Sequence, residues 1–511
     1  MSTTEKPEQV ARAPLSRVLQ NSTLYLSGNV ASRALGFIAI PFYSHFLSPA
    51  EYGTIELIEI STQVVAISFG LQTIGTALIR LFHDQDTVKQ ETDVVSTTVI
   101  ATALLSGVIV TMAVLLATPI SLAVFHSTEH AGLLRAAFVA MWFSSIVEII
   151  LVYQRIRERA KFFFCYSMIS LAGSLGLNIY FIGFVGAGVW GFVYSKLVVT
   201  GIGTAFLLCT TLREVGWHWQ RGYIPKLVHF GLPLCFASMC IFAIHFSDRF
   251  FLVDAVSLSE LGKYALAYKF AFLASILVSD SFGKSWNTTF YRFARQDGWR
   301  ERFARVAQYL FFALYLTALA VSLTAPELLS LMVPSSFYPP FLLLPILVLS
   351  YVFRDCGDFF RNLMLINKRS NTVATTVSAA ALLNFALNFA LIPSFGIYGA
   401  ALATMGTWLA YMVVFWLITW NEHHIPIRIM SFAKITIFAV GIFTMANNCR
   451  IEYRYIQLLI DGVWIAAFAT LSFAFYFSAS DRADIVASVM AQVRRLSRHK
   501  LQSGTPPHSE G

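Results

Sequence analysis

Apolar stretches of about twenty residues recur along almost the whole chain, and short polar connections separate them. A helix of this length crosses the hydrocarbon core of a bilayer, which is about 30 Å thick. The pattern predicts about fourteen spanning helices, at approximately 22–46, 54–79, 94–118, 132–153, 162–183, 187–211, 227–253, 261–283, 304–325, 341–365, 372–393, 396–420, 431–449 and 456–478. We therefore expect an all-α integral membrane protein.

Composition supports this class. The chain has 511 residues, of which 57% are hydrophobic and 13% charged, and its mean hydropathy is +0.65. A soluble globular protein of this length would carry about 25% charged residues. The six cysteines fall in or beside apolar spans, and their spacing fits neither a disulfide framework nor a zinc site. We expect no cofactor and no metal.

Basic residues gather in alternate connections, which is the pattern of the positive-inside rule. Most of the 37 Lys and Arg residues lie in the N-terminal tail, in every second loop and in the C-terminal tail, whereas the intervening loops hold only Arg450 and Arg454. This bias predicts that both termini are cytoplasmic, which requires an even number of spans. It also accounts for the net charge of +9, so the charge does not indicate a nucleic-acid partner.

The two ends of the chain read as cytoplasmic tails. Residues 1–20 are polar and lack the apolar core and cleavage site of a signal peptide. Residues 481–511 form a basic tail, and its first part, 481–500, has the apolar and basic faces of an amphipathic helix lying on the cytoplasmic leaflet.

An internal repeat divides the spans between the tails. The segment Leu47–Gly53 (LSPAEYG) matches Val256–Gly262 (VSLSELG), and the turn Gly188–Gly191 (GVWG) matches Gly396–Gly399 (GIYG), both at an offset of about 209 residues. Six predicted helices separate each copy from the other, and an even number preserves orientation, so the repeats are parallel.

The repeat predicts two six-helix lobes around a central cavity near the midplane of the membrane. We expect an N-terminal lobe over residues 21–212, a C-terminal lobe over 213–420, and two additional helices over 421–480.

Charged residues inside the predicted spans are the strongest functional signal. A cation at membrane depth costs several kcal/mol unless it faces a watery cavity or a partner. Five such cations suggest a cavity that binds an anion, and we expect them to bind substrate: Arg33, Lys196, Arg249, Lys269 and Arg354. Four acids are candidates for coupling transport to protons or sodium ions: Glu56, Asp248, Asp280 and Asp358.

The alternative is that these charges pair with one another and fix helix packing. Arg354, Asp358 and Arg361 share one helical face by their spacing, whereas Asp355 is expected to point elsewhere, because adjacent residues on a helix diverge by about 100°. Asp248, Asp355 and Asp358 are the acids to which this structural role applies best.

No catalytic centre emerges. The run His126–His130 fits an H-x-x-E-H zinc pattern, but it lies in a short loop without a further ligand at a suitable spacing. A membrane glycosyltransferase or polymerase would need sizeable outer loops with acidic motifs, and the longest outer connection, 326–340, is short and carries only Glu327. We expect a protein that is not an enzyme.

These features together resemble the multidrug/oligosaccharidyl-lipid/polysaccharide exporter superfamily, and within it the polysaccharide transporters that flip O-antigen units. The resemblance covers roughly residues 20–480, and its carriers are Leu47–Gly53, Gly231–Pro233, Asp248–Arg249, Glu260–Tyr264 and Gly396–Gly399. It implies alternating access between two lobes. It also implies an undecaprenyl-diphosphate-linked oligosaccharide as substrate, taken from O-antigen, capsule or exopolysaccharide synthesis and moved across the cytoplasmic membrane.

Two other transport functions stay open within the same superfamily, a cation-coupled drug exporter and a flippase for the peptidoglycan precursor. An exporter of cationic drugs favours an acidic cavity, whereas the first span here carries Arg33 and no acid. Association with a polysaccharide polymerase and glycosyltransferases is a further expectation.

Overall fold

The computed structural model describes residues 37–483, apart from 38, 86, 281, 284–285, 287–296, 341, 367–368, 426–428, 452 and 480. Both predicted tails, Arg33 and nearly all of the amphipathic segment 481–500 lie outside the described residues. Within them the chain forms helices and connections without strands. The helices are α2 (Pro49–Ser68), α3 (Ile74–His83), α4 (Val88–Leu115), α5 (Ala117–Phe125), α6 (Ala131–Ile156), α7 (Ala160–Asn178), η1 (Ile179–Phe184), α8 (Gly188–Val215), α9 (Tyr223–Ala255), α10 (Leu258–Ser275), η2 (Ile276–Asp280), α12 (Trp299–Met332), η3 (Ser335–Phe337), α13 (Leu343–Ile366), α14 (Ser370–His423), α15 (Ile429–Asn448) and α16 (Arg454–Phe475).

The predicted all-helical membrane fold is confirmed. Among the described residues, nine helices are long and apolar enough to cross a membrane. The second and third predicted spans are each broken into two helices, α2 with α3 and α4 with α5. Because most of the span 22–46 lies outside the described residues, the number fourteen stays a prediction.

Two predicted spans, 372–393 and 396–420, share the single label α14. Gly396 interrupts the helix with φ +53° and ψ −129°. The two arms run antiparallel, since Asn384 donates a hydrogen bond to Thr407 at 3.2 Å and Gly399 lies against the backbone of Leu391. A left-handed φ of this kind favours glycine, which explains this residue at the turn.

The two copies of the repeat have the same local geometry. Ser48 and Ser257 are both extended N-caps, and each side chain accepts a hydrogen bond from the backbone N–H three residues later, at 3.2 Å. Gly188 begins α8 with φ +52°, as Gly396 begins the second arm of α14. The repeat inferred from the sequence is therefore present in the structure.

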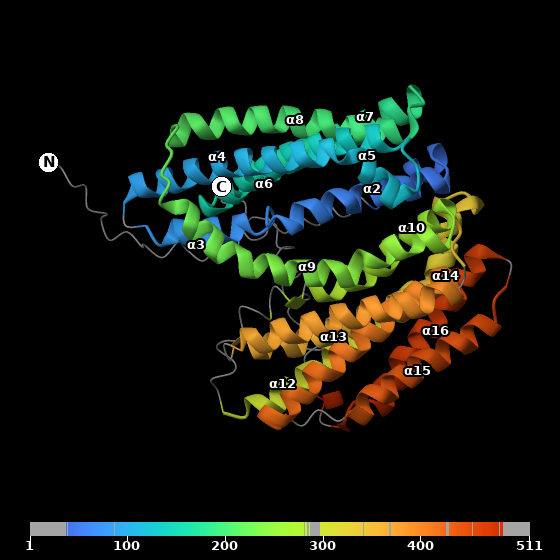
Figure 1. Cartoon of the computed structure of the whole chain (residues 1–511). Helices are drawn as coiled ribbons and strands as arrows, with labels where there is room; N and C mark the ends of the chain where they lie inside the picture. The colour runs from blue at the N-terminus through green and yellow to red at the C-terminus, as the bar shows by residue number, and fades with distance from the viewer. Residues whose placement is uncertain are drawn as a thin grey trace, which may run out of the picture.

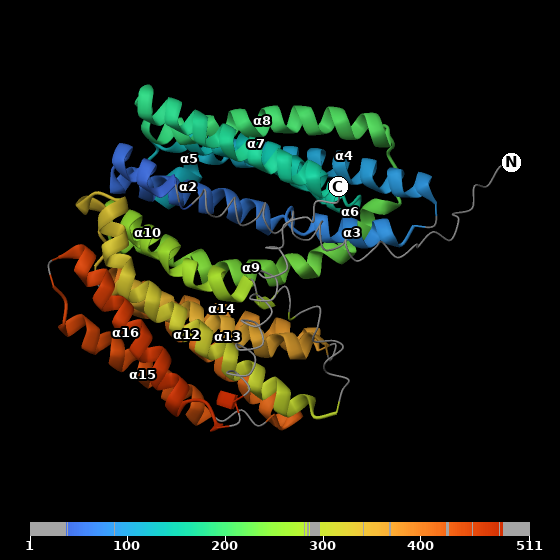
Figure 2. The ribbon, with the colours of Figure 1, turned by 180° about the vertical axis from the view of Figure 1, so that it is seen from behind.

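The helices form two groups (Figures 1 and 2), which we call the N-lobe (α2–α8) and the C-lobe (α9–α16). α9 begins beside α3, where Thr73 donates a hydrogen bond to the carbonyl of Gly231 at 3.2 Å. It continues past Pro233 to lie along α14 in the C-lobe. α15 and α16 pack on α12 and stand outside the repeat. The lobe boundaries at 212 and 420 stay predictions.

The lobes meet where α2 and α10 begin (Figure 1). Gly53 of α2 and Gly262 of α10 occupy equivalent places in the two repeats and pack against each other's helices. A Cβ atom at Gly53 would lie 2.3 Å from the carbonyl oxygen of Leu258, and one at Gly262 would lie 2.0 Å from that of Pro49. Only glycine permits this contact between backbones. The first part of α9 lies beside α3, whereas the other helices of the two lobes diverge toward the end where α8 ends and α12 begins (Figures 1 and 2).

Candidate functional site

One face of α2 carries the acids that meet the other lobe. The helix starts at a capping box, in which Ser48 and Glu51 satisfy each other's backbone N–H groups, and Pro49 occupies its first turn. Tyr52, Glu56 and Glu59 follow at spacings of four and three residues, which place them on one side of the helix. The carboxylates of Glu56 and Glu59 both pair with lysines of other helices.

Glu56 joins the N-lobe to two cations of the C-lobe. Its carboxylate lies 3.8 Å from Nε of Arg249 on α9 and 3.5 Å from Nζ of Lys269 on α10. The Lys269 ammonium also donates a hydrogen bond to the hydroxyl of Tyr52 at 2.8 Å and lies over the ring of that tyrosine. We call Tyr52, Glu56, Glu59, Lys196, Arg249 and Lys269 the inter-lobe cluster.

Glu59 meets its cation inside the N-lobe. Nζ of Lys196, on α8, lies 2.5 Å from the Glu59 carboxylate. Two neighbouring acids of one helix thus have different partners: Glu56 bridges the lobes, and Glu59 does not.

Arg249 is buried, and protein groups contact its guanidinium on several sides. Its side chain is 1% exposed. The guanidinium donates hydrogen bonds to Asp248 at 2.8 Å and to the carbonyl of His245 at 2.6 Å, and it stacks on the ring of Tyr268 at 4.1 Å. Tyr264 donates a further hydrogen bond to Asp248. Asp248 therefore has the structural role considered above, in which buried charges pair with one another and fix helix packing.

Removing one partner from this buried pair should destabilise the protein. Asp248→Ala leaves the Arg249 guanidinium without its closest counter-charge, which costs about 3–5 kcal/mol in buried pairs. Thermal unfolding of the purified protein in detergent should show a large fall in Tm. Asp84→Ala is the control, because Asp84 and Arg80 are exposed partners 4.0 Å apart and such pairs contribute little. Equal melting of the two variants would contradict the structural role of Asp248.

Lys269 and Lys196 differ from Arg249 because their side chains are open. The Lys269 side chain is 47% exposed, and the Lys196 and Glu59 side chains are 36% and 35% exposed. All three lie within apolar helices, and their side chains are accessible, whereas that of Arg249 is buried. An accessible charge inside an apolar helix is a candidate for contact with water or with a polar ligand.

A second charged group lies inside the C-lobe. Arg354 on α13 donates hydrogen bonds to Asp355 at 2.7 Å and to Ser275 of α10 at 2.7 Å. Arg361 lies 3.0 Å from Asp358, which also accepts a hydrogen bond from Tyr411. Arg354, Asp358 and Arg361 line one small cavity of about 80 Å³, together with residues of α9 and α14.

The predicted face shared by Arg354, Asp358 and Arg361 is present, because all three line the same cavity. Asp355 lies off this face, as expected: it does not line the cavity, and it accepts a hydrogen bond from Ser279 at 2.6 Å. The guanidinium of Arg354 nevertheless reaches the Asp355 carboxylate, because its side chain is long and flexible although the two Cα–Cβ bonds diverge.

The predicted residues therefore separate into three groups. Glu56, Lys196, Arg249 and Lys269 come together in the inter-lobe cluster, with Asp248 behind Arg249. Arg354 and Asp358 lie in the C-lobe group. Arg33 and the side chain of Asp280 lie outside the described part of the chain. The sequence analysis missed Tyr52 and Tyr268, which contact Lys269 and Arg249 respectively. The only signal in the sequence was position: Tyr52 lies one helical turn before Glu56, and Tyr268 directly precedes Lys269.

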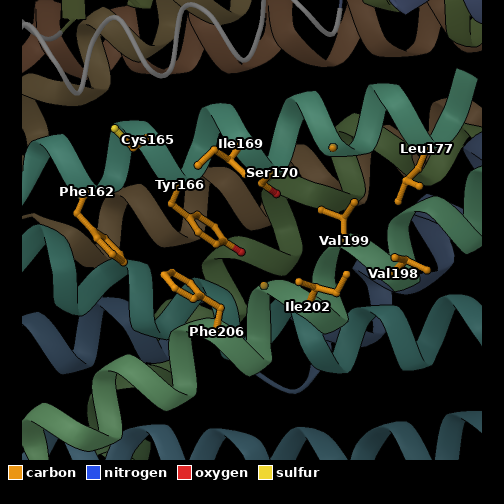
Figure 3. Close-up of a pocket in the computed structure, with 12 residues that line it drawn as sticks. Phe162, Cys165, Tyr166, Ile169, Ser170, Leu177, Val198, Val199, Ile202 and Phe206 are labelled. Carbon is orange, nitrogen blue, oxygen red and sulfur yellow. The ribbon is translucent and has the colours of Figure 1, made fainter.

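The larger cavities are apolar and suit lipid better than a charged ligand. One cavity of about 460 Å³ lies between α7 and α8, and the rings of Tyr166 and Phe206 point toward each other across it (Figure 3). Phe162, Ile169, Val199 and Phe206 are among its lining residues, and no charged residue contributes. Another cavity, of about 450 Å³, lies among α2, α9 and α14, with Asp254 as its one charged lining residue.

The H-x-x-E-H run does not assemble a metal centre in the structure. His126 contacts Asp254 of α9 at 2.6 Å, and His130 stacks on Phe125. Within the residues that the structure describes, no group of three or more His, Cys, Asp or Glu side chains is placed to hold a metal ion.

Several solved structures have a similar fold. A lipid II flippase MurJ in an inward closed conformation aligns with a TM-score of 0.68 and 15% identity over 88% of this chain and 99% of that one. An outward-facing multidrug resistance transporter of the MATE family gives 0.57 and 14% over 80% and 95%. A MOP superfamily transporter from Pyrococcus furiosus, described as having a binding pocket of reverse polarity, aligns with a TM-score of 0.52 and 13% identity over 80% of this chain and 95% of that one. The fold is that of the multi-pass membrane transporters of the MOP superfamily.

A family model described as polysaccharide biosynthesis protein matches residues 44–342. This match covers more than half of the chain, and the chain belongs to that family. The resemblance inferred from the repeat segments is confirmed. No curated protein matches the chain significantly.

Proposed function

We propose that this protein moves a polyprenyl-diphosphate-linked oligosaccharide from the inner to the outer leaflet of the cytoplasmic membrane. O-antigen, capsule and exopolysaccharide repeat units are the substrates that the proposal covers. The observation that carries it is the pair of half-open cations Lys269 and Lys196, set in apolar helices beside the contact between the lobes. Family membership and the transporter fold support it.

The chemistry of the substrate matches this cluster. A diphosphate presents several anionic oxygens, and an ammonium binds such oxygens as a point charge. Lys269 and Lys196 are the side chains that can reach a headgroup, and Arg249 supplies positive potential from behind Lys269. We keep Arg33 and Arg354 as further phosphate-binding residues of the pathway. The sugars need polar contacts, and the prenyl chain can stay in lipid.

The arrangement of the lobes supports alternating access. By the positive-inside pattern, Ser48 and Ser257 lie on the outer side, and the basic loop after α6 lies in the cytoplasm. The lobes meet at the outer side, where Gly53 and Gly262 pack together. We infer that this is a state closed toward the outside, with both termini cytoplasmic. Asp280, Asp358 and the acids of the cluster are the candidates for proton or sodium coupling.

Two alternatives have support from the comparisons. Likeness to the MurJ structure favours a flippase for the peptidoglycan precursor, which would also use cavity cations. Likeness to MATE transporters favours a cation-coupled exporter. The Pyrococcus furiosus transporter argues against assuming drug export from this fold alone, because its pocket of reverse polarity suggests a different function for that protein.

Deletion of the gene in its native bacterium distinguishes these functions. We expect loss of surface polysaccharide together with accumulation of the diphosphate-linked oligosaccharide in the inner leaflet. Association with a polymerase and glycosyltransferases can be examined in the same cells. Unchanged surface glycan without an accumulated lipid intermediate would reject the proposal and direct attention to drug efflux and to precursor flipping.

A further inference from the structure

The cations of the inter-lobe cluster already have anions beside them. Lys269 and Arg249 share the carboxylate of Glu56, and Lys196 is paired with Glu59. Both acids come from one face of α2. A diphosphate that binds Lys269 or Lys196 must therefore compete with a carboxylate of the protein itself.

The contacts of Glu56 are loose enough to be exchanged. Its oxygens lie 3.5 Å and 3.8 Å from the two cationic nitrogens, beyond the usual range of a direct hydrogen bond. In the described part of the chain, Nε of Arg249 is buried and makes no hydrogen bond. The open side of Lys269 gives an incoming phosphate access, and a phosphate oxygen accepts stronger hydrogen bonds than Glu56 does at these distances.

Glu56 also connects the two lobes close to the contact that closes the outer side. It lies one turn beyond Gly53, the residue of α2 that packs against Gly262 of α10. Tyr52, on the same face of α2, lies with its ring centroid 5.9 Å from that of Phe337 in the C-lobe. Losing the contacts of Glu56 removes the charge attraction between α2 and the pair α9 and α10.

We propose that Glu56 is a displaceable counter-ion that couples headgroup binding to opening of the outer side. The inference rests on the proposed function. A diphosphate takes Lys269 from Glu56, and the lobes lose the ionic link that holds α2 to α10. Glu59 is displaced from Lys196 in the same manner, but both partners belong to the N-lobe, so this exchange adds affinity without releasing the lobes. A neutral molecule offers Lys269 no charge in place of Glu56, so the exchange favours an anionic headgroup.

The test compares Glu56→Gln with Glu59→Gln, a matched pair three residues apart on one helix face. Spin labels at Thr128 and Ser336, on the outer ends of the two lobes, report the distance between them. They are introduced as cysteines in the full chain after the six native cysteines are replaced by alanine, and the protein is studied in lipid nanodiscs. Pyrophosphate is the headgroup probe, and farnesyl diphosphate is the same group on a prenyl chain.

Without any ligand, Glu56→Gln should lengthen the distance between the labels, and Glu59→Gln should leave it unchanged. Both variants should bind pyrophosphate about tenfold more tightly, because each removes a competing carboxylate. In the spin-labelled protein that retains Glu56, pyrophosphate or farnesyl diphosphate should lengthen the distance between the labels. This measurement tests the exchange without a substitution at Glu56.

The outcomes separate this inference from the proposed function. If both variants leave the ligand-free distance unchanged, or if Glu56→Gln weakens pyrophosphate binding, Glu56 is not a displaceable link. A longer ligand-free distance in Glu56→Gln together with no binding of either diphosphate would support the link between the lobes but reject exchange with a headgroup, and with it the proposed substrate.

Discussion

Replacing Gly262 with alanine should abolish transport while the chain still inserts into the membrane. The new Cβ atom would lie 2.0 Å from the carbonyl oxygen of Pro49 and 3.1 Å from the backbone nitrogen of Gly53. Both are backbone atoms, which cannot rotate away as a side chain does. The two lobes must therefore separate at their outer ends, and the conformation that receives substrate from the inner leaflet is lost.

Transport by Gly262→Ala and its location in the membrane are measured together, with Gly441→Ala as control. Gly441 lies in α15, and a Cβ atom there meets nothing within 4 Å, so the helix gains a better helix-former at no steric cost. The label distance between Thr128 and Ser336 should be longer in Gly262→Ala than in the control. Normal transport by Gly262→Ala would mean that the contact between α2 and α10 does not need to form.

Loss of the Lys269 charge should have the second largest effect. Lys269→Ala removes the most exposed cation of the inter-lobe cluster and leaves Glu56 facing the same space with one partner fewer. We expect transport to fall at least tenfold, which corresponds to about 1.4 kcal/mol of lost interaction with the anionic headgroup. Lys269→Arg keeps the charge and should retain part of the activity, limited by the change in geometry.

The measurement is transport of lipid-linked oligosaccharide at matched protein levels. Lys161→Ala is the control, because Lys161 is an exposed lysine at the start of α7 and has the same chemistry outside the cluster. Equal transport by Lys269→Ala and Lys161→Ala would remove Lys269 from the binding site and weaken the assignment of an anionic substrate.

Local sequence patterns predicted the elements of this fold well. The length of the apolar runs locates most helices to within a few residues, because hydrocarbon thickness sets that length. The repeat was also visible in the sequence. In both copies a serine caps a helix, at Ser48 and Ser257, and a glycine with positive φ forms a turn, at Gly188 and Gly396. Breaks inside a span were not visible, and the second span is divided after Ser68 although its composition stays apolar.

Contacts between distant helices could not be predicted in the same way. The sequence identified Gly53 and Gly262 as equivalent, but not that they pack against each other across the lobes. It marked Glu56 as a candidate acid without indicating that its partners are Lys269 and Arg249 of the other lobe. Arg354 donates a hydrogen bond to Asp355 because its side chain is long and flexible, and helical spacing alone does not predict such a contact. Pairing between charges on different helices depends on how those helices pack, and no spacing rule within one helix encodes it.

Transport in proteoliposomes tests the central claim most directly. The purified protein is reconstituted with an undecaprenyl-diphosphate-linked oligosaccharide from the native bacterium, and a lectin or glycosidase outside the vesicles detects sugars that reach the outer leaflet. We predict movement across the bilayer that depends on the protein and is lost in Lys269→Ala. Movement no faster than in protein-free vesicles, with the protein folded and correctly inserted, would contradict the account.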